Sequence, residues 1–509
     1  MSRISAVVTL MILFSVALYA GGQRDAQATL RVMIVERSEI PKDQGRLNDN
    51  PWTEYVQKEM SQLGIDVRFV PMGGSLVRHT VMMATNTAPD VAFTHGRLLF
   101  MKFAADGGLH DLGPHIREYG PNIPRVLGES HLTLGQIDGV QYAIPSRRQI
   151  DSRYGSFIRK DWLDALGLDE PTTRAELTDV LRAFRDKNPG NVPAAELRPW
   201  GWFTDDPGTV FDSDFKLFDV MYSFLEHDLR ANMGTVWPVR DGFREFMRWL
   251  NGLYREGLIE REFATDSFDI KTRHVVNGSV GFVHAAWSYP YAQNSSSVAL
   301  NLARNVPGAE LVPVDVFEGP DGVHRRLRNL PGQHYVFSPR RSRVPDAAVA
   351  YLNWLLTDEI AWNLTFGRTG DQHTIVDGVP VFSDLQYFQD TFGYIDASLR
   401  ILGDYPFKPE ITNSVRRQFR VIDFSGHDDR AMAMARENSF LEPVFQSKMS
   451  AMARLGPGLI RICESYWVKL ITEANFDAQY DEFISRLYNR GLQQIIDERT
   501  AYLDRFGID

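Results

Sequence analysis

Several acidic residues stand close together in the sequence, and carboxylates are the groups with which glycosidases work. Asp205 with Asp206, and Asp212 with Asp214, form such pairs. In a glycosidase one carboxyl protonates the leaving oxygen while the other acts as base or nucleophile. Acidic pairs are also common on solvated surfaces, and sequence spacing does not give the separation of the carboxyl groups. We therefore expect no catalytic residue. An enzyme, specifically a secreted glycosidase or lyase acting on polysaccharide, is the alternative to this non-catalytic interpretation.

Other catalytic and cofactor motifs are missing from the sequence. Ser279 lies in "NGSVG", which lacks the first glycine of the nucleophile-elbow motif G-x-S-x-G. The histidines, among them His95, His284, His334 and His373, are dispersed without the spacing of metal ligands. No glycine-rich phosphate loop or dinucleotide fingerprint occurs. We expect neither a cofactor nor a bound metal.

The charge balance argues against nucleic acid as a partner. The chain has 65 acidic and 55 basic residues, for a net charge of −10. The basic residues form only short clusters, "SRRQIDSR", "HRRLR" and "PRRSR", rather than a basic face. The single cysteine, Cys463, lies in an apolar helical pattern, which favours a buried free thiol and excludes an internal disulfide.

The first residues have the pattern of an export signal. Arg3 precedes an apolar run from Ile4 to Ala20, which ends in small residues. We expect residues 1–20 to be a signal peptide cleaved near Ala20. A retained membrane anchor is the alternative, although the run is slightly short of the roughly 20 residues that span a bilayer. Between Ala17 and Gly22 there is no cysteine for a lipid anchor, so we expect a soluble mature chain outside the cytoplasmic membrane.

Strand and helix patterns alternate from residue 28 onward. The strands are "ATLRVMIV", "IDVRFVPM" and the apolar part of "TAPDVAFTHG", and the segment "NPWTEYVQKEMSQLG" between the first two is a helix that ends at its glycine. Such alternation is typical of a parallel α/β sheet. Ligands of these sheets bind beyond the carboxyl ends of the strands, which makes the residues after the first and third strands candidates. They are Glu36, Thr94, His95 and Arg97.

A second series of elements follows residue 150, and a chain of 509 residues exceeds the size of one hydrophobic core. It includes "YGSFIRKDWLDALGL", a helix in "PTTRAELTDVLRAFRDKNP" and the strand "VGFVH". Thr172 and Thr173 are candidate caps of that helix, with Glu176 in its first turn. Trp200 is expected to pack in the core, and the last 60 residues are expected to be mostly helical.

Seven segments, in order, resemble the extracellular solute-binding proteins of family 1. They are "TAPDVAFTHGRLLFMKFAADGGLHDL", "IDGVQYAIPS", "RKDWLDALGLDEPTTRAELTDVLRAFRDKNP", "LNGLYREGLIEREFAT", "NGSVGFVHAAWSYP", "DAAVAYLNWLLTDE" and "QYDEFISRLYNRGLQQIIDERTAYLDRF". The family includes maltose-binding protein and longer lipoprotein-type relatives that bind oligosaccharides. The chain departs from the lipoprotein members in lacking the anchoring cysteine, and from the shorter members in its longer helical C-terminus.

The resemblance implies a periplasmic-binding-protein-like α/β fold of type 2, with two α/β lobes, a ligand cleft between them and a helical C-terminal extension. The first lobe would comprise residues 28–143 and 314–365, and the second residues 144–313 and 366–509. The implied function is the capture of a carbohydrate, specifically an oligosaccharide, in the periplasm or on the outer face of the cell membrane, and its delivery to an ABC transporter permease. A sensor subunit that binds the same ligand is a further alternative. We expect a monomer.

The resemblance also suggests ligand-binding residues. The family places an aromatic loop after the strand "VGFVH", so Trp287 and Tyr289 are expected to stack on sugar rings. Thr94, His95 and Arg97 carry over by position, and a pair of arginines after the first crossing strand could bind hydroxyls or a carboxylate. The complete candidate set is Trp287, Tyr289, Thr94, His95, Arg97, Arg147, Arg148, Trp202, Asp205 and Glu36.

Overall fold

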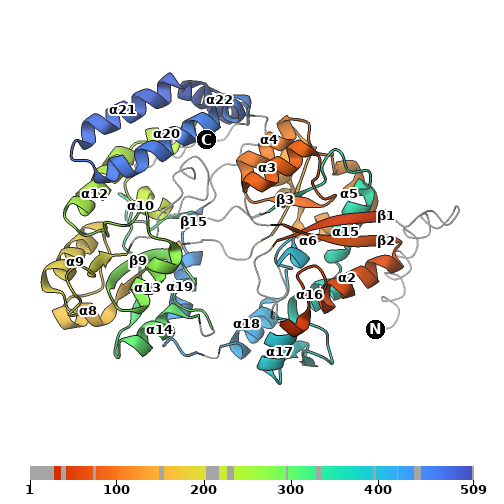
Figure 1. The fold of residues 1–509 in the computed structure, drawn as a ribbon, viewed down its shortest axis with the longest axis horizontal. Helices are drawn as coiled ribbons and strands as arrows, with labels where there is room; N and C mark the ends of the chain where they lie inside the picture. Colours follow the sequence, from red (N-terminus) through yellow and green to blue (C-terminus); the bar gives the residue numbers. More distant parts are fainter. Residues whose placement is uncertain are drawn as a thin grey trace. The chain divides into compact units, whose positions relative to one another are not determined.

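The computed structural model describes most of the chain, in two compact units (Figure 1). It describes residues 28–35, 42–72, 76–147, 154–201, 217–225, 234–293, 296–327, 334–393, 397–420, 422–440 and 449–506. Unit 1 lies within Met1–Arg148 and Pro331–Gln418, and unit 2 within Gln149–Leu330, Phe419–Phe445 and Met449–Asp509. The expected signal peptide lies outside the described residues.

Unit 1 begins with parallel strands joined by a helix. β1 (Ala28–Val35) pairs in parallel with β2 (Ile65–Met72) along all of its length. α2 (Pro51–Gln62) connects them and is capped by Asn50 in a capping box with Thr53. β3 (Ala92–Thr94) extends this pairing through Val91, whose backbone bonds to both Arg31 and Met33 of β1. The expected strand–helix–strand order is confirmed.

A three-stranded arrangement continues from β3. β12 (Tyr335–Phe337) lies between β3 and β6 (Ile144–Pro145) and is antiparallel to both. The other elements of unit 1 are α3 (Leu76–Thr85), α4 (Arg97–Ala105), α5 (Gly113–Tyr119), α6 (Asn122–Leu127), α7 (Glu129–Leu132), β4 (Gln136–Ile137), β5 (Val140–Gln141), α15 (Pro345–Leu355), α16 (Asp358–Phe366), β13 (Thr374–Val376), β14 (Val379–Val381), α17 (Leu385–Thr391) and α18 (Pro409–Gln418).

Residues 366–418 belong to unit 1, whereas the resemblance implied that they belong to the second lobe. The hydrogen bonds of this segment explain the grouping. The backbone N–H of Val35 donates to the Ser398 hydroxyl at 3.0 Å. The backbone N–H of Arg147 donates to the Leu402 carbonyl at 2.8 Å, which ties the segment to the ends of β1 and β6.

Unit 2 has a mixed four-stranded sheet. Its order is β10 (Leu311–Val314), β7 (Tyr154–Arg159), β9 (Val280–Ala286) and β8 (Arg198–Trp200), with β7 antiparallel to both β10 and β9. β8 runs parallel to β9. Trp200 is 0% exposed, and its ring lies edge-on to Phe282, which confirms the expected core position.

Helices cover this sheet, and the C-terminal segment forms a helical layer. The other elements of unit 2 are α8 (Lys160–Leu166), α9 (Arg174–Lys187), α10 (Phe218–Tyr222), α12 (Phe243–Arg255), α13 (Phe268–Val276), α14 (Val298–Asn305), β11 (Arg326–Leu327), α19 (His427–Arg436), β15 (Ser439–Phe440), α20 (Ser450–Thr472), α21 (Phe476–Asn489) and α22 (Leu492–Phe506). α20 contacts α12, α21 and α22, so the expected helical C-terminus is confirmed (Figure 1). Cys463 is buried in α20, and burial raises the pKa of its thiol.

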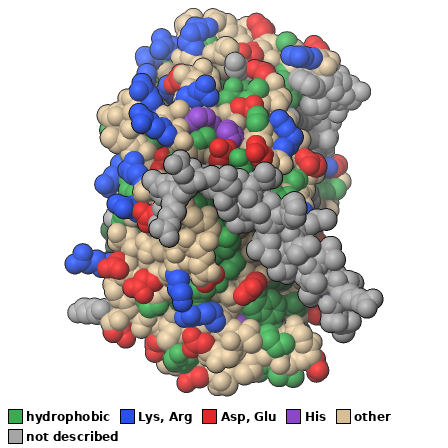
Figure 2. Space-filling model, turned by 90° about the vertical axis from the view of Figure 1, so that its right-hand side faces the viewer, with side chains coloured by type: hydrophobic (Ala, Val, Ile, Leu, Met, Phe, Trp, Pro, Cys, Tyr) green, Lys and Arg blue, Asp and Glu red, His purple; other side chains and the backbone are tan. Residues whose placement is uncertain are grey.

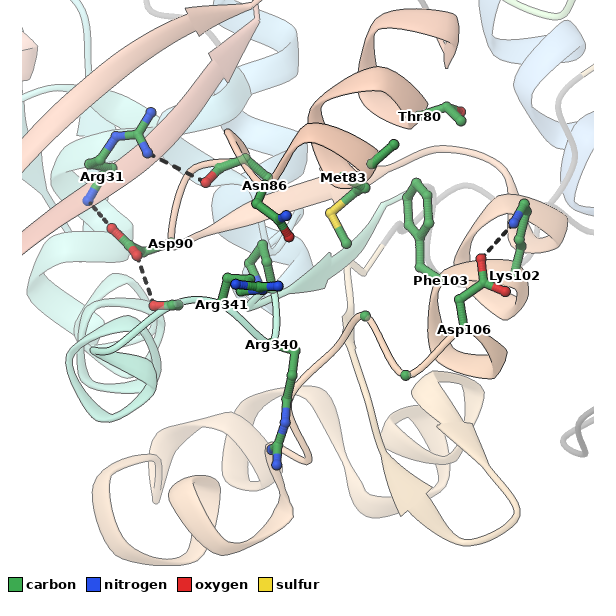
Figure 3. A pocket seen from close by; sticks show the side chains of 16 residues that line it. Arg31, Thr80, Met83, Asn86, Asp90, Lys102, Phe103, Asp106, Arg340 and Arg341 are labelled. Atoms are coloured by element: carbon green, nitrogen blue, oxygen red, sulfur yellow. Dashed lines mark hydrogen bonds and ion pairs between the residues drawn. The ribbon is translucent and has the colours of Figure 1, made fainter.

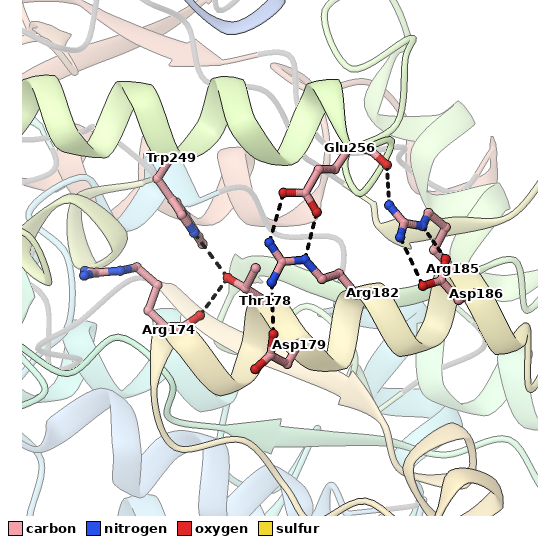
Figure 4. Close-up of polar contacts among 8 residues, drawn as sticks. All are labelled: Arg174, Thr178, Asp179, Arg182, Arg185, Asp186, Trp249 and Glu256. Atoms are coloured by element: carbon pink, nitrogen blue, oxygen red, sulfur yellow. Dashed lines mark hydrogen bonds and ion pairs between the residues drawn. The ribbon is translucent and has the colours of Figure 1, made fainter.

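Polar contacts fix α9 against α12 on the surface of unit 2 (Figure 4). The Arg182 guanidinium donates to both carboxylate oxygens of Glu256, at 2.8 and 3.0 Å. The Trp249 indole N–H donates to the Thr178 hydroxyl at 3.2 Å. At the start of α9, Thr173 and Glu176 form a capping box, as the sequence predicts.

Among the described residues, no helix is both long enough and apolar enough to cross a bilayer. On the face shown in Figure 2, Lys and Arg side chains are interspersed with Asp and Glu, and the basic ones are denser toward its upper left. The α/β fold with a helical C-terminal region is thus the one that the sequence predicts.

Candidate ligand-binding site

One edge of the unit 1 sheet gathers residues from three distant parts of the chain. In the register of the sheet, Tyr335 of β12 lies opposite both Thr94 of β3 and Pro145 of β6. Because β12 runs against the other two strands, the residue before it, His334, meets the residues that follow them. The edge therefore brings together Thr94, His95, Ser146 and His334.

The backbone at this edge is fixed by reciprocal hydrogen bonds. The N–H of Ser146 donates to the His334 carbonyl at 2.8 Å, and the N–H of His334 donates to the Ser146 hydroxyl at 3.0 Å. The Nε2 atom of His131 lies 3.1 Å from the carbonyl oxygens of both Pro145 and Ser146. These contacts hold the C-terminal end of β6 in register with the N-terminal end of β12.

Ring contacts surround Phe93 at this edge, and two buried side chains nearby in the fold of unit 1 lack hydrogen-bond partners among the described residues. The ring centroids of His95 and His334 are 4.6 Å apart, and the Phe93 ring lies edge-on to both rings. Thr94 is 0% exposed and His79 of α3 is 2% exposed. In the part of the chain that the structure describes, neither the Thr94 hydroxyl nor either His79 ring nitrogen has a hydrogen-bond partner. Desolvation lowers the pKa of His79, so its ring is neutral at pH 7.

Arg97, beside this edge, makes hydrogen bonds within the protein. It is the first residue of α4 and is only 8% exposed. Its guanidinium donates to the Leu134 carbonyl at 2.9 Å and to the Tyr335 hydroxyl at 3.3 Å. These bonds fix α4 to the neighbouring loop and strand. A direct contact between Arg97 and ligand stays a prediction.

Arg147 follows β6 and is half-buried. Its guanidinium donates to the Val126 carbonyl at 3.3 Å, and its own carbonyl accepts from the N–H of Asp404 at 2.9 Å. Gly403 has φ of +86°, and a Cβ there would lie 2.0 Å from the Arg147 carbonyl oxygen, so the close approach requires glycine. Whether Arg147 contacts ligand also stays a prediction.

Trp287 is the candidate aromatic residue at the end of β9 in unit 2. It is half-buried and packs against the hydrophobic core formed by residues such as Phe157 and Val283. It also lines a small hollow together with Tyr154 and Met434. A Cβ on Gly155 would lie 3.6 Å from the Trp287 Cα, so the backbone of Trp287 lies close against β7.

Tyr289, two residues further on, is anchored to α13. Its hydroxyl donates to the Thr272 hydroxyl at 3.2 Å, and its ring lies edge-on to Phe268 with centroids 5.9 Å apart. Burial raises the pKa of this phenol, so it remains a neutral donor. Its hydroxyl already has an intramolecular partner, and stacking of Tyr289 on a ligand stays a prediction.

The remaining candidates lie outside the described residues. They are Glu36, Arg148, Trp202 and Asp205, together with the acidic pairs that a glycosidase would need. Within the described residues, no group of three or more His, Cys, Asp or Glu side chains is arranged to hold a metal ion. Sequence reasoning missed His79 and Ser146, because one lies within an ordinary helical pattern and the other gains its role only through pairing with His334.

The profile of the family described as bacterial extracellular solute-binding protein matches residues 46–362. The chain is 23% identical over 253 residues to the fructooligosaccharide ABC transporter substrate-binding protein FusA of Streptococcus pneumoniae, covering 46% of this chain and 45% of that protein. It is 23% identical over 339 residues to the polygalacturonan/rhamnogalacturonan-binding protein YtcQ of Bacillus subtilis, covering 64% of each chain. The chain thus spans less than two thirds of the length of these two relatives.

Solved structures show the same fold. The crystal structure of the alginate-binding protein AlgQ2 without calcium ion matches with a TM-score of 0.67 and 21% identity, over 94% of this chain and 98% of that one. A solute-binding protein of Bifidobacterium longum infantis associated with an HMO-binding ABC transporter matches with a TM-score of 0.66 and 17% identity, over 95% and 99% of the two chains.

Proposed function

Because the chain belongs to the bacterial extracellular solute-binding protein family, we propose that it captures an oligosaccharide outside the cytoplasm and delivers it to the permease of an ABC transporter. The curated relatives named above are described as binding fructooligosaccharide and polygalacturonan or rhamnogalacturonan. The observation in this chain that carries the proposal is Trp287 at the end of β9. Its ring packs against the hydrophobic core but is only half-buried, so part of it is exposed for contact with a ligand.

The two candidate regions offer the two kinds of contact that a sugar needs. A pyranose ring presents C–H groups that pack on an aromatic face, and Trp287 offers such a face. The hydroxyl groups of the sugar need hydrogen-bond partners. His95 at the unit 1 edge, half-buried beside His334, is the proposed partner. Arg147 and Arg148 would add donors for hydroxyls or a carboxylate.

We propose that one ligand contacts residues of both units. A ligand shifts an equilibrium between conformations only through its different affinity for them, so contacts from both units would couple binding to a change of conformation. The permease would then recognise the ligand-bound form of a monomeric protein. Binding of this kind needs no covalent chemistry, and the proposal therefore includes release of the sugar unchanged.

A thermal-shift screen against neutral and acidic mono- and oligosaccharides tests this function. A ligand that binds only the folded state raises the unfolding midpoint by mass action. We expect a concentration-dependent rise with at least one oligosaccharide, which is then recovered chemically intact. Consumption of the sugar would favour the glycosidase or lyase alternative. No shift with any saccharide would contradict a carbohydrate ligand and direct the search to other solutes.

A further inference from the structure

A pocket of about 450 Å³ lies in unit 1 at the opposite end of β3 from the candidate site (Figure 3). Asp90 and Ser342 line it, and they stand before β3 and after β12, respectively. The ends of α3 and α4 supply the other walls, through residues such as Met83 and Lys102. Its volume falls in the range of pockets that bind small molecules.

The side chains that line this pocket have a positive net formal charge. Its basic residues are Arg31, Lys102, Arg340 and Arg341, and its acidic residues are Asp90 and Asp106, which leaves a formal charge of +2. Lys102 pairs with Asp106 at 2.5 Å. The Asp90 carboxylate accepts from the backbone N–H of Arg31 at 2.9 Å and from the Ser342 hydroxyl at 2.8 Å. Both carboxylates are therefore already engaged.

Among the described residues, the side chains of Arg340 and Arg341 have no hydrogen-bond or ion-pair partner, and of these two it is Arg341 that lies toward Asn86 (Figure 3). The Arg341 side chain is exposed and makes no hydrogen bond or ion pair with any residue that the structure describes. Figure 3 shows it directed toward Asn86 and Met83, whereas Arg340 points away from them. The turn that carries it is held by the Arg340 N–H, which donates to the Gly108 carbonyl at 2.7 Å, and by the Ser342 N–H, which donates to the Pro339 carbonyl at 2.8 Å.

The rest of the lining is mixed in character. Met83, Phe103 and Pro339 supply apolar surface, and Asn86 and Thr80 supply polar groups. At Gly108 a Cβ would lie 3.2 Å from the Phe103 carbonyl oxygen and 3.4 Å from the Met83 Cε, so a larger residue there would crowd the pocket floor. A small anion with both an apolar face and hydroxyl groups matches this lining.

We propose that this pocket is a second saccharide site that binds a uronate, with the Arg341 guanidinium on the sugar carboxylate. Arginine binds carboxylates through two parallel hydrogen bonds, and the planar guanidinium makes this contact more directional than a lysine would. The C–H face of the uronate lies toward Met83, and its hydroxyl groups bond to Asn86. Trp287 does not line this pocket, and the proposal does not depend on the function proposed for that residue.

Titration calorimetry of the full chain with monomeric galacturonate, and with galactose as the neutral match, tests the proposal. We expect Arg341→Gln to weaken galacturonate binding about tenfold, the scale of losing a charge-assisted hydrogen-bond pair. Arg343→Gln is the matched control, because Arg343 is also exposed but does not line the pocket.

Several outcomes would overturn the proposal. They are an unchanged galacturonate affinity in Arg341→Gln, an equal loss in Arg343→Gln, and galactose binding as tight as that of galacturonate. Inorganic phosphate that competes with galacturonate at equal concentration would indicate a general anion site and would also contradict uronate recognition. Unfolding midpoints of both variants, expected to equal that of the parent protein, verify that loss of binding does not reflect loss of folding.

Discussion

The carboxyl edge of the unit 1 sheet and the end of β9 in unit 2 both carry candidate ligand residues, but they offer different interactions. In unit 1, the buried Thr94 hydroxyl and His79 ring have no hydrogen-bond partner among the described residues, and the half-buried His95 ring lies beside His334. At the end of β9, the Tyr289 hydroxyl is bound to Thr272, and Trp287 presents an aromatic ring on a closed core.

The difference suggests a division of roles. A buried polar group without a partner lowers stability, so the unit 1 edge carries a cost that a closed core does not have. At the end of β9, the half-buried ring of Trp287 packs against the hydrophobic core of unit 2. We therefore expect Trp287 to contribute an apolar contact and the unit 1 edge to contribute hydrogen bonds, so that both regions add to the affinity for one ligand.

The largest expected effect concerns the support of the β9 end. Glu260 is buried, with Arg198 at 3.3 Å and Lys271 at 3.9 Å, and Lys271 precedes the Thr272 that holds Tyr289. Removing one charge from a buried network leaves the others uncompensated, so Glu260→Gln should lower the free energy of unfolding by about 3–5 kcal/mol. Urea unfolding measures it.

Glu256→Gln is the control for this prediction. Glu256 pairs with Arg182 across α9 and α12, but both side chains are about 40% exposed. Exposed pairs contribute little, so we expect a loss of about 1 kcal/mol or less. Equal losses in the two variants would show that the buried network does not support the β9 end in the way described.

The next largest effect concerns ligand affinity. Trp287→Ala should weaken oligosaccharide binding by about 1–3 kcal/mol, the scale of losing a buried aromatic contact. Tyr289→Phe should change the affinity little, because the hydroxyl that it removes already bonds to Thr272. Titration calorimetry with a ligand from the thermal-shift screen measures both. A larger loss in Tyr289→Phe than in Trp287→Ala would reverse the assignment of roles within this loop.

A smaller effect tests the unsatisfied hydroxyl of the unit 1 edge. Thr94→Val removes a buried hydroxyl without a partner among the described residues and keeps the β-branched shape, so stability should rise by about 1 kcal/mol. Ser146→Ala should instead lose about 1 kcal/mol, because its hydroxyl accepts from the N–H of His334. Thermal or urea unfolding distinguishes the two. Destabilisation by Thr94→Val would indicate that the hydroxyl has a partner, such as an ordered water.

The smallest effect is the acid dependence of stability. Desolvation lowers the pKa of His79 in the folded state, so the unfolded chain binds a proton there more readily. The contribution of this residue to stability is present above the unfolded pKa of about 6.5 and falls as the pH drops below it. His79→Leu should therefore show a shallower loss of stability between pH 7.5 and pH 5 in urea unfolding. An identical pH slope in both proteins would contradict the buried neutral state.

Local sequence patterns were sufficient for several helices and strands and for several core residues. The threonine and glutamate at the start of α9 predicted its cap, and the apolar helical spacing around Cys463 predicted a buried thiol. These features depend on neighbours within a few residues, where spacing and propensity are informative.

The arrangement of the candidate site depends on contacts that no local pattern contains. Thr94 meets Tyr335 across 241 positions of the chain, and residues 397–402 join unit 1 through bonds to Val35 and Arg147. Arg97 was predicted as a loop residue near ligand, yet it begins α4 and its guanidinium bonds to Leu134 and Tyr335. Its type and position suggested a ligand contact, but its burial could be learned only from the three-dimensional packing.

The most direct test of the central claim is titration calorimetry of one oligosaccharide with the parent protein, His95→Ala, Trp287→Ala and the double variant. If one ligand contacts both units, each single substitution should weaken affinity about tenfold, and the sugar should be recovered unchanged. Full affinity in His95→Ala or in Trp287→Ala, absence of binding in the parent protein, or consumption of the sugar would contradict it.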